Sequence, residues 1–182
     1  MSPPSGTHRL GPDSAELLVK SYREGVAAKV GHDLVIVVGR WEATLELPED
    51  PAAATVSLTA DSRSLRPREG HGGVKSLTDK DRDEIGKNID SKVLKGAPIA
   101  FRSTSVAAQG DGLAVAGELS IGGATRPVTA SVEDRDGALH TTIPLVQSEY
   151  GITPYRGLMG ALKVRDDVEI VLTANLKGSD PV

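Results

Sequence analysis

Apolar and polar residues alternate with a period of two in many short stretches of this chain. In residues 54–61, for example, Val56, Leu58 and Ala60 share one face and hydroxyl-bearing residues occupy the other. A strand of an antiparallel sheet with one buried and one solvated face has this pattern. The same alternation predicts four further strands, at residues 113–121, 126–132, 139–145 and 168–176.

Three other stretches also read as strands, although their alternation is less regular. They are residues 15–22, 33–47 and 99–106. The second is unusually long for one strand, and its apolar register reverses after Val38, so that Trp41 begins the opposite phase. A bulge or sharp bend near Gly39 explains such a reversal.

Short glycine-containing segments separate several of the predicted strands. They are Gly110-Asp111-Gly112, Gly122-Gly123 and Asp136-Gly137. Connections of this kind are typical of β-hairpins. Residues 98–146 are therefore predicted to form a four-stranded meander.

One surface helix is predicted after the first half of the chain. Thr78 and Asp81 have the spacing of a capping box, with Asp in place of the usual Glu. Ile85 and Ile89 then share an apolar face, and Gly96 precedes a proline that ends the helix. A shorter helical turn is expected at residues 26–30.

About eight such strands cannot remain one open sheet with a dry face, so they must close into a barrel or pair as a sandwich. A meander of sequential strands favours an up-and-down antiparallel barrel. We therefore predict an all-β fold with one barrel domain at residues 9–177. Residues 1–8 are expected to form a flexible tail, and residues 178–182 a second tail.

Aromatic residues make up only 3% of the chain, so few large side chains are available to fill the barrel interior. A barrel of about eight strands has room inside for its own side chains or for one small ligand. Here the inward side chains are mostly Val, Ala, Leu and Ile. An elongated apolar cavity and a filled, ligand-free core both remain open on composition alone.

Charge and cysteine content exclude several classes of function. The formal net charge is −4 and there is no cysteine. Acidity argues against a nucleic-acid partner, and the lack of thiols removes disulfides and cysteine-ligated metals. The longest dense apolar run, Leu34–Val38, is far shorter than the ~20 residues of a membrane helix. The chain starts without an apolar leader, so a cytoplasmic location is expected; no metal or cofactor is expected, and a homodimer is left open.

No established catalytic motif appears. The histidines lack the H-E-x-x-H spacing, and neither a G-x-S-x-G elbow nor a phosphate-binding glycine loop is present. The pair His32-Asp33 can be read as acid–base partners on a small apolar substrate, or His32 can contact a ligand headgroup or the backbone. Arg126 can be read as a phosphate contact or as a surface residue.

Five segments together resemble the YceI-like family, described as lipocalin-like, polyisoprenoid-binding barrels. No single segment is specific, but their order spans Arg9 to Leu176. The segments are His32-Asp33-Leu34, PIAFRSTSV (98–106), GELSIGGATRPVTASV (117–132), Glu149-Tyr150-Gly151-Ile152 and Asp167-Val168-Glu169-Ile170. Two departures are the missing signal peptide and the absence of aromatic residues from 91–97.

The resemblance implies binding, transport or storage of a long hydrophobic ligand, such as a polyisoprenoid or an isoprenoid quinone, with no catalysis. Residues 150–160 could then form a ligand gate or plug the barrel end. The enzyme with His32 and Asp33, and a ligand-free stress-response or interaction module, remain the alternatives. The expected ligand-binding residues are Leu34, Ile36, Val38, Phe101, Leu119, Ile143, Leu145, Tyr150, Ile152 and Tyr155, with His32 and Arg126 as headgroup contacts.

Overall fold

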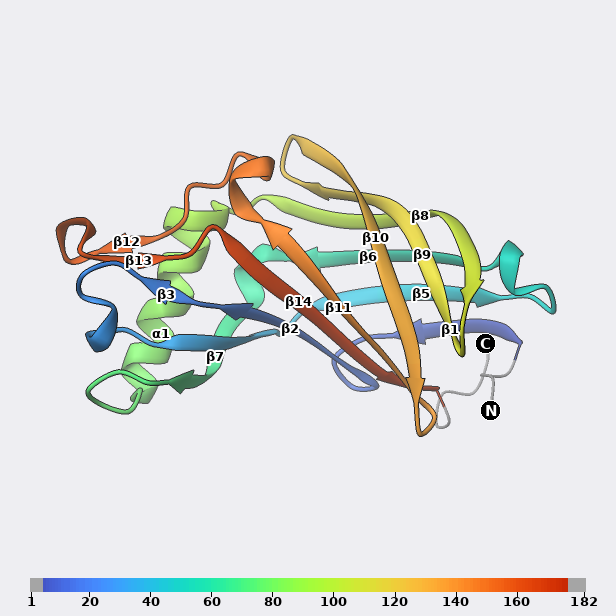
Figure 1. Ribbon diagram of the computed structural model, residues 1–182, viewed down its shortest axis with the longest axis horizontal. Coiled ribbons are helices and arrows are strands. Elements are labelled where there is room, and N and C mark those ends of the chain that lie inside the picture. Colours follow the sequence, from blue (N-terminus) through green and yellow to red (C-terminus); the bar gives the residue numbers. More distant parts are fainter. Residues whose placement is uncertain (1–4, 177–182) are drawn as a thin grey trace.

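The computed structural model describes residues 5–176, which form an antiparallel sheet of eleven strands and a second sheet of three. In the large sheet the order is β1-β5-β6-β8-β9-β10-β11-β14-β2-β4-β7. Its strands are β1 (Gly6–Leu10), β2 (Ala15–Ser21), β4 (Asp33–Val38), β5 (Trp41–Leu47), β6 (Thr55–Asp61), β7 (Leu65–His71), β8 (Pro98–Gln109), β9 (Gly112–Ile121), β10 (Ala124–Arg135), β11 (Ala138–Val146) and β14 (Asp167–Asn175). The large sheet curls around one long axis, as Figure 1 shows, in a lipocalin-like barrel.

The small sheet extends one end of the barrel. Its strands, in the order β12-β13-β3, are β12 (Arg156–Gly157), β13 (Leu162–Val164) and β3 (Arg23–Glu24). In Figure 1 it lies at the left, next to α1 (Asp79–Asn88). Strand β1 lies toward the opposite end of the barrel (Figure 1).

The stretch predicted as one bent strand is two strands, β4 and β5, which lie near opposite ends of the strand order. They remain parts of one long hairpin, because β5 pairs with β6 and β4 pairs with β7. Across the bend, Gly39 N donates to Ser64 O at 2.9 Å and Asp61 N donates to Arg40 O at 2.9 Å. A Cβ on Gly39 would lie 3.1 Å from Ser64 O, so the close approach favours glycine. This bent hairpin joins the two ends of the sheet and rolls it into a barrel.

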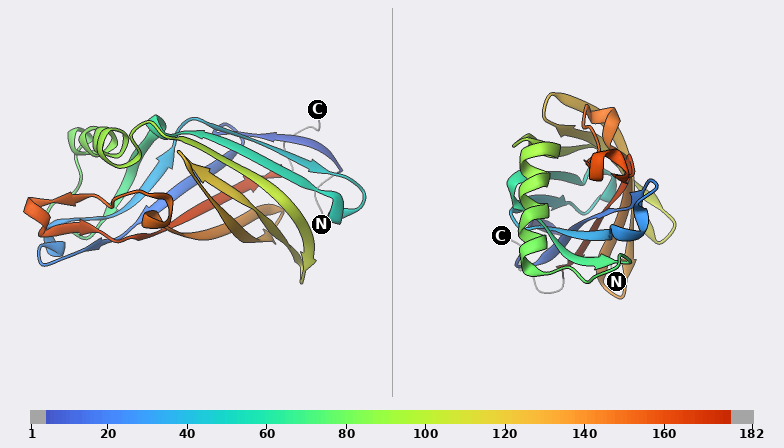
Figure 2. Two further views of the ribbon diagram at one scale, coloured as in Figure 1. Left: turned by 90° about the horizontal axis from the view of Figure 1, so that it is seen from above. Right: turned by 90° about the vertical axis from the view of Figure 1, so that its left-hand side faces the viewer.

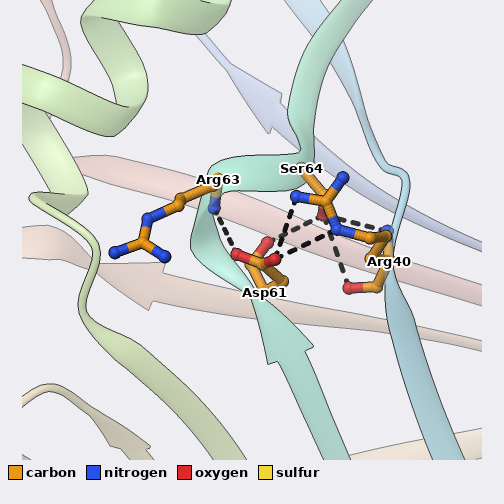
Figure 3. A network of polar contacts seen from close by, with 4 residues as sticks. All are labelled: Arg40, Asp61, Arg63 and Ser64. Atoms are coloured by element: carbon orange, nitrogen blue, oxygen red, sulfur yellow. Dashed lines mark hydrogen bonds and ion pairs between the residues drawn. The ribbon is translucent and has the colours of Figure 1, made fainter.

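A polar network braces the bend of this hairpin (Figure 3). Arg40 donates to Asp61 Oδ2 from Nε at 3.0 Å and from Nη2 at 2.9 Å, and Arg63 N donates to Asp61 Oδ1 at 2.8 Å. The hydrogen bond from Arg63 N, with the one from Arg40, lowers the pKa of Asp61. Ser64 Oγ completes the network by accepting from Arg40 N at 2.9 Å.

The meander and the helix agree with the sequence prediction. Strands β8, β9, β10 and β11 are consecutive neighbours in the sheet. At the start of α1, Thr78 Oγ1 accepts from Asp81 N at 3.1 Å and Asp81 Oδ2 accepts from Thr78 N at 2.8 Å, which completes the capping box. A π-helical turn, η4 (Ile89–Leu94), continues the helix. The predicted short turn corresponds to the 3-10 turn η1 (Ala28–Val30).

Two expectations about the chain's organisation differ from the structure. The strand count exceeds eight, because residues 33–47 divide in two and β1, β7 and the small sheet add short strands. The predicted tail at residues 1–8 is too long, because Gly6–His8 pair with β5 and His8 is fully buried. A five-residue strand carries too little periodic signal to be found without its partner. Residues 1–4 and the predicted tail at 178–182 lie outside the described residues.

Candidate functional site

A cavity of about 1530 Å³ runs through the barrel. Its volume exceeds the roughly 300–1,000 Å³ of an ordinary small-molecule pocket. Each of the eleven strands of the large sheet contributes at least one aliphatic side chain to its wall. One such side chain from each strand, in chain order, is Leu10, Leu17, Leu34, Leu45, Val56, Leu65, Ile99, Leu119, Val128, Ile143 and Ile170.

The wall is aliphatic and the interior is open. Phe101 and Tyr155 are the two aromatic side chains among its lining residues, apart from two histidines. Val56, Leu58 and Ile143 point inward yet are only half-buried, because the cavity leaves part of their surface accessible. The barrel core is therefore not filled by the side chains of residues 5–176.

Helix α1 and η4 close one side of the barrel end, as the right-hand view of Figure 2 shows. Ile85, Ile89, Val93 and Leu94 from these two elements line the cavity. Ile85 and Ile89 form the apolar face predicted from the sequence. The opposite face of α1 carries the charged residues.

The two ends of the cavity carry opposite charge. At the end formed by the small sheet and η1, the basic lining residues are Arg23, His32 and Lys163. At the other end, the turns between strands and the end of β10 contribute acidic residues. These are Glu49, Asp111, Asp134 and Asp136. An elongated ligand therefore meets a cationic and an anionic end.

Hydrogen bonds hold two of the residues at the cationic end, Arg23 and His32. Arg23 Nη1 donates to Gly31 O at 2.5 Å, and Arg23 N donates to Asp33 Oδ1 at 2.9 Å. His32 Nε2 lies 2.7 Å from Lys75 O, so that nitrogen carries the proton and donates it to the carbonyl. Asp33 and His32 therefore have separate partners, and in the described part of the chain no hydrogen bond joins them.

A polar atom without a partner lies in the cavity wall. Thr141 Oγ1 and Trp41 Nε1 are the buried side-chain polar atoms of residues 5–176 that lack a hydrogen-bond partner. Thr141 is 7% exposed and lines the cavity. Since an unsatisfied buried hydroxyl costs stability, a ligand oxygen or nitrogen near it would be favoured.

Most of the predicted site residues lie together in the cavity wall. The ten that do so are His32, Leu34, Ile36, Val38, Phe101, Leu119, Ile143, Leu145, Ile152 and Tyr155. Tyr155 also lies under Lys92, whose Nζ is 5.8 Å from the ring centre.

Tyr150 and Arg126 are not among the lining residues. Tyr150 packs in a buried cluster with Leu145, and burial raises the pKa of its phenol. Arg126 is exposed, and its Nε donates to Glu149 O at 3.0 Å. That hydrogen bond directs the guanidinium to the chain next to Tyr150 rather than into the lumen.

Sequence reasoning missed Arg23, Lys163 and Thr141. The sequence pattern could have identified Thr141, because it shares the inward register of Leu139 and Ile143 on β11. The other two lie on strands of two and three residues, which leave no periodic signal.

No group of three or more His, Asp or Glu side chains among residues 5–176 could hold a metal ion. Over the same residues, none of the helices has the length and apolar character needed to cross a bilayer.

Comparison with known proteins agrees with this architecture. The crystal structure of Burkholderia cenocepacia BcnA superposes with a TM-score of 0.63, covering 87% of this chain and 94% of that one. At 16% identity, this likeness shows the fold alone. The comparison with curated proteins gave no match. The YceI-like domain matches residues 20–176, most of the barrel and its small sheet. With that match over most of its length, the chain belongs to the YceI-like family.

Proposed function

We propose that this protein binds, transports or stores a long-chain hydrophobic ligand in the barrel lumen and does not transform it. The ligand class is a polyisoprenoid or an isoprenoid-quinone-like lipid. The observation that carries the proposal is the cavity of about 1530 Å³ with a predominantly aliphatic wall. Members of the YceI-like family are generally polyisoprenoid-binding barrels, which supports a hydrophobic ligand.

Burial of apolar surface supplies the affinity. Each buried methylene contributes about 0.8 kcal/mol, so ten buried carbons contribute ~8 kcal/mol before the costs of association. The 12-residue strand β8 spans roughly 40 Å. A cavity that follows such strands suits an extended chain better than a compact molecule.

The polar end of the ligand lies at the end of the lumen that carries Arg23, His32 and Lys163. Arg23 and Lys163 offer hydrogen-bond donors to a hydroxyl, carbonyl or phosphate oxygen, whereas the Nε2–H of His32 is already donated to Lys75 O. The acidic residues at the other end would repel an anionic headgroup. The bound ligand therefore has its polar end next to the small sheet.

Native mass spectrometry with geranylgeraniol, a C20 isoprenoid alcohol, tests the proposal. We expect a 1:1 complex whose ligand mass is unchanged after prolonged incubation. An unliganded mass after challenge with excess geranylgeraniol would contradict ligand binding.

The variant His32→Gln separates the carrier from the enzyme alternative. A carrier retains geranylgeraniol binding in this variant, with an affinity within a few-fold of the wild type. An enzyme that uses His32 as an acid or base would convert a substrate in the wild type and lose that turnover in the variant. The cytoplasmic location and the homodimer stay predictions, to be measured by cell fractionation and light scattering.

A further inference from the structure

Strongly exposed apolar side chains gather at the tip of the molecule formed by the small sheet. Val26 is 95% exposed, Leu158 60% and Met159 106%. They lie on two neighbouring loops, because β13 pairs with both β3 and β12 and Ala27 N donates to Ala161 O at 2.9 Å. Figures 1 and 2 show these loops at one extreme of the long axis. We call Val26, Leu158 and Met159 the apolar tip.

The backbone holds two of these side chains in an unusual conformation. Leu158 and Met159 have φ angles of 49° and 57°, the left-handed region that residues with large side chains rarely adopt. Strain of this kind persists where the surrounding structure imposes it and is frequent at functional sites. Neither side chain gains burial in return. The conformation therefore presents apolar groups to the surroundings without benefit to the fold.

Basic residues surround the apolar tip. Residues 23–32 and 155–164 contain four basic side chains and one acidic side chain, whereas the whole chain has a net charge of −4. The basic ones are Arg23, Lys29, Arg156 and Lys163. The tip is thus a locally cationic region on an anionic protein.

The apolar tip adjoins residues that line the lumen. Val30 is 49% exposed and also lines the cavity, as do Leu162 and Val164 on β13. A molecule leaving the cavity at this end would pass between these residues and reach the tip directly.

We propose that this tip docks on a lipid surface that contains anionic headgroups. Val26, Leu158 and Met159 enter the interface between headgroups and acyl chains, while Lys29 and Arg156 contact the headgroups. A second copy of the chain fits the tip less well, because tip-to-tip contact would bring the two sets of basic residues together. Docking would place this end of the cavity at the bilayer surface. The inference goes beyond the proposed function, since attachment to vesicles does not require a ligand in the lumen.

Co-sedimentation of the full chain with sucrose-loaded vesicles tests this docking. Vesicles contain phosphatidylcholine alone or with 30% phosphatidylserine. The wild type should bind the phosphatidylserine vesicles, and the partition coefficient should fall at least tenfold in the triple variant Val26→Ser, Leu158→Asn, Met159→Asn. Asparagine is chosen because it tolerates the left-handed region. The double variant Lys29→Gln, Arg156→Gln should lose the preference for phosphatidylserine and its dependence on salt.

Two controls separate docking from folding and from ligand binding. The double variant Lys80→Gln, Lys87→Gln also removes two positive charges, but from the exposed face of α1. It should bind vesicles like the wild type. All variants should retain the wild-type melting temperature and bind farnesol delivered in solution. If the wild type does not bind farnesol, that result contradicts the proposed function but does not contradict the docking.

Three outcomes would overturn the proposal. The wild type could fail to sediment with either vesicle, or the triple variant could sediment as well as the wild type. Alternatively, the wild type could self-associate in analytical ultracentrifugation without binding vesicles, with self-association lost in the triple variant. That last result would assign the tip to a second copy of the chain.

Discussion

The ring of Phe101 on β8 packs directly against Gly117 on β9. A Cβ built on Gly117 would lie 2.5 Å from Phe101 Cζ and 2.5 Å from the backbone oxygen of Arg102. Glycine is therefore required at this position for an aromatic side chain to lie in the cavity wall. The absence of one side chain on β9 thus determines where the only lining phenylalanine can lie.

Replacing this glycine should destabilise the barrel. Gly117→Ala forces Phe101 and the backbone of β8 to move, and we expect a loss of about 1–3 kcal/mol in the free energy of unfolding. Urea unfolding measures it. Gly123→Ala is the matched control, because nothing lies within 4 Å of its Cβ position. Equal stability of the two variants would contradict the close packing.

A large side chain on the inner face of β10 should reduce ligand capacity. Ala130 is 5% exposed and lines the cavity, so Ala130→Trp would project an indole into the lumen. We expect at least tenfold weaker binding of geranylgeraniol, measured by competition in native mass spectrometry. The neighbouring variant Thr129→Trp, on the exposed face of the same strand, should bind like the wild type. Unchanged binding by Ala130→Trp would argue against a ligand in this lumen.

Removal of the unpartnered hydroxyl of Thr141 should stabilise the unliganded protein. Thr141→Val replaces a buried hydroxyl without a hydrogen bond by a methyl group of similar size. We expect a gain of roughly 1 kcal/mol in the free energy of unfolding. Thr142→Val, on the exposed side of β11, serves as the control and should change little. A destabilised Thr141→Val would show that the hydroxyl has a partner in solution.

The corner of the long hairpin should make stability depend on acidic pH. The hydrogen bonds from Arg63 N and Arg40 lower the pKa of Asp61 in the folded state. The ionised Asp61 carboxylate therefore contributes fully to the free energy of unfolding above its pKa in the unfolded state, near 4. That contribution is lost as the pH falls through its lower pKa in the folded state. Asp61→Asn should be less stable than the wild type at pH 7, and the difference should shrink toward pH 2.

Urea titrations at several pH values measure this effect. Asp13→Asn, at an exposed turn, provides a carboxylate control whose difference from the wild type should stay small throughout. A constant difference between Asp61→Asn and the wild type from pH 7 to pH 2 would exclude the ionised carboxylate as the source.

Local features of the chain were well predicted from the sequence. Period-two alternation located strands such as β6, and the spacing of Thr78 and Asp81 located the capped helix. The same alternation placed residues such as Leu34 and Ile143 on the face that lines the cavity. These features depend on neighbours within a few residues, so the sequence contains the necessary information.

The tertiary structure decided the features that depend on distant pairing. His8 is buried because β1 pairs with β5, and the bend at Gly39 separates two strands of the sheet because Asp61 and Ser64 bind across it. Arg126 lies outside the predicted site because its side chain donates a hydrogen bond to the backbone carbonyl of Glu149. Aliphatic composition alone was compatible with a filled or an empty barrel. The diameter set by eleven curled strands, a property of the whole sheet, left the lumen open.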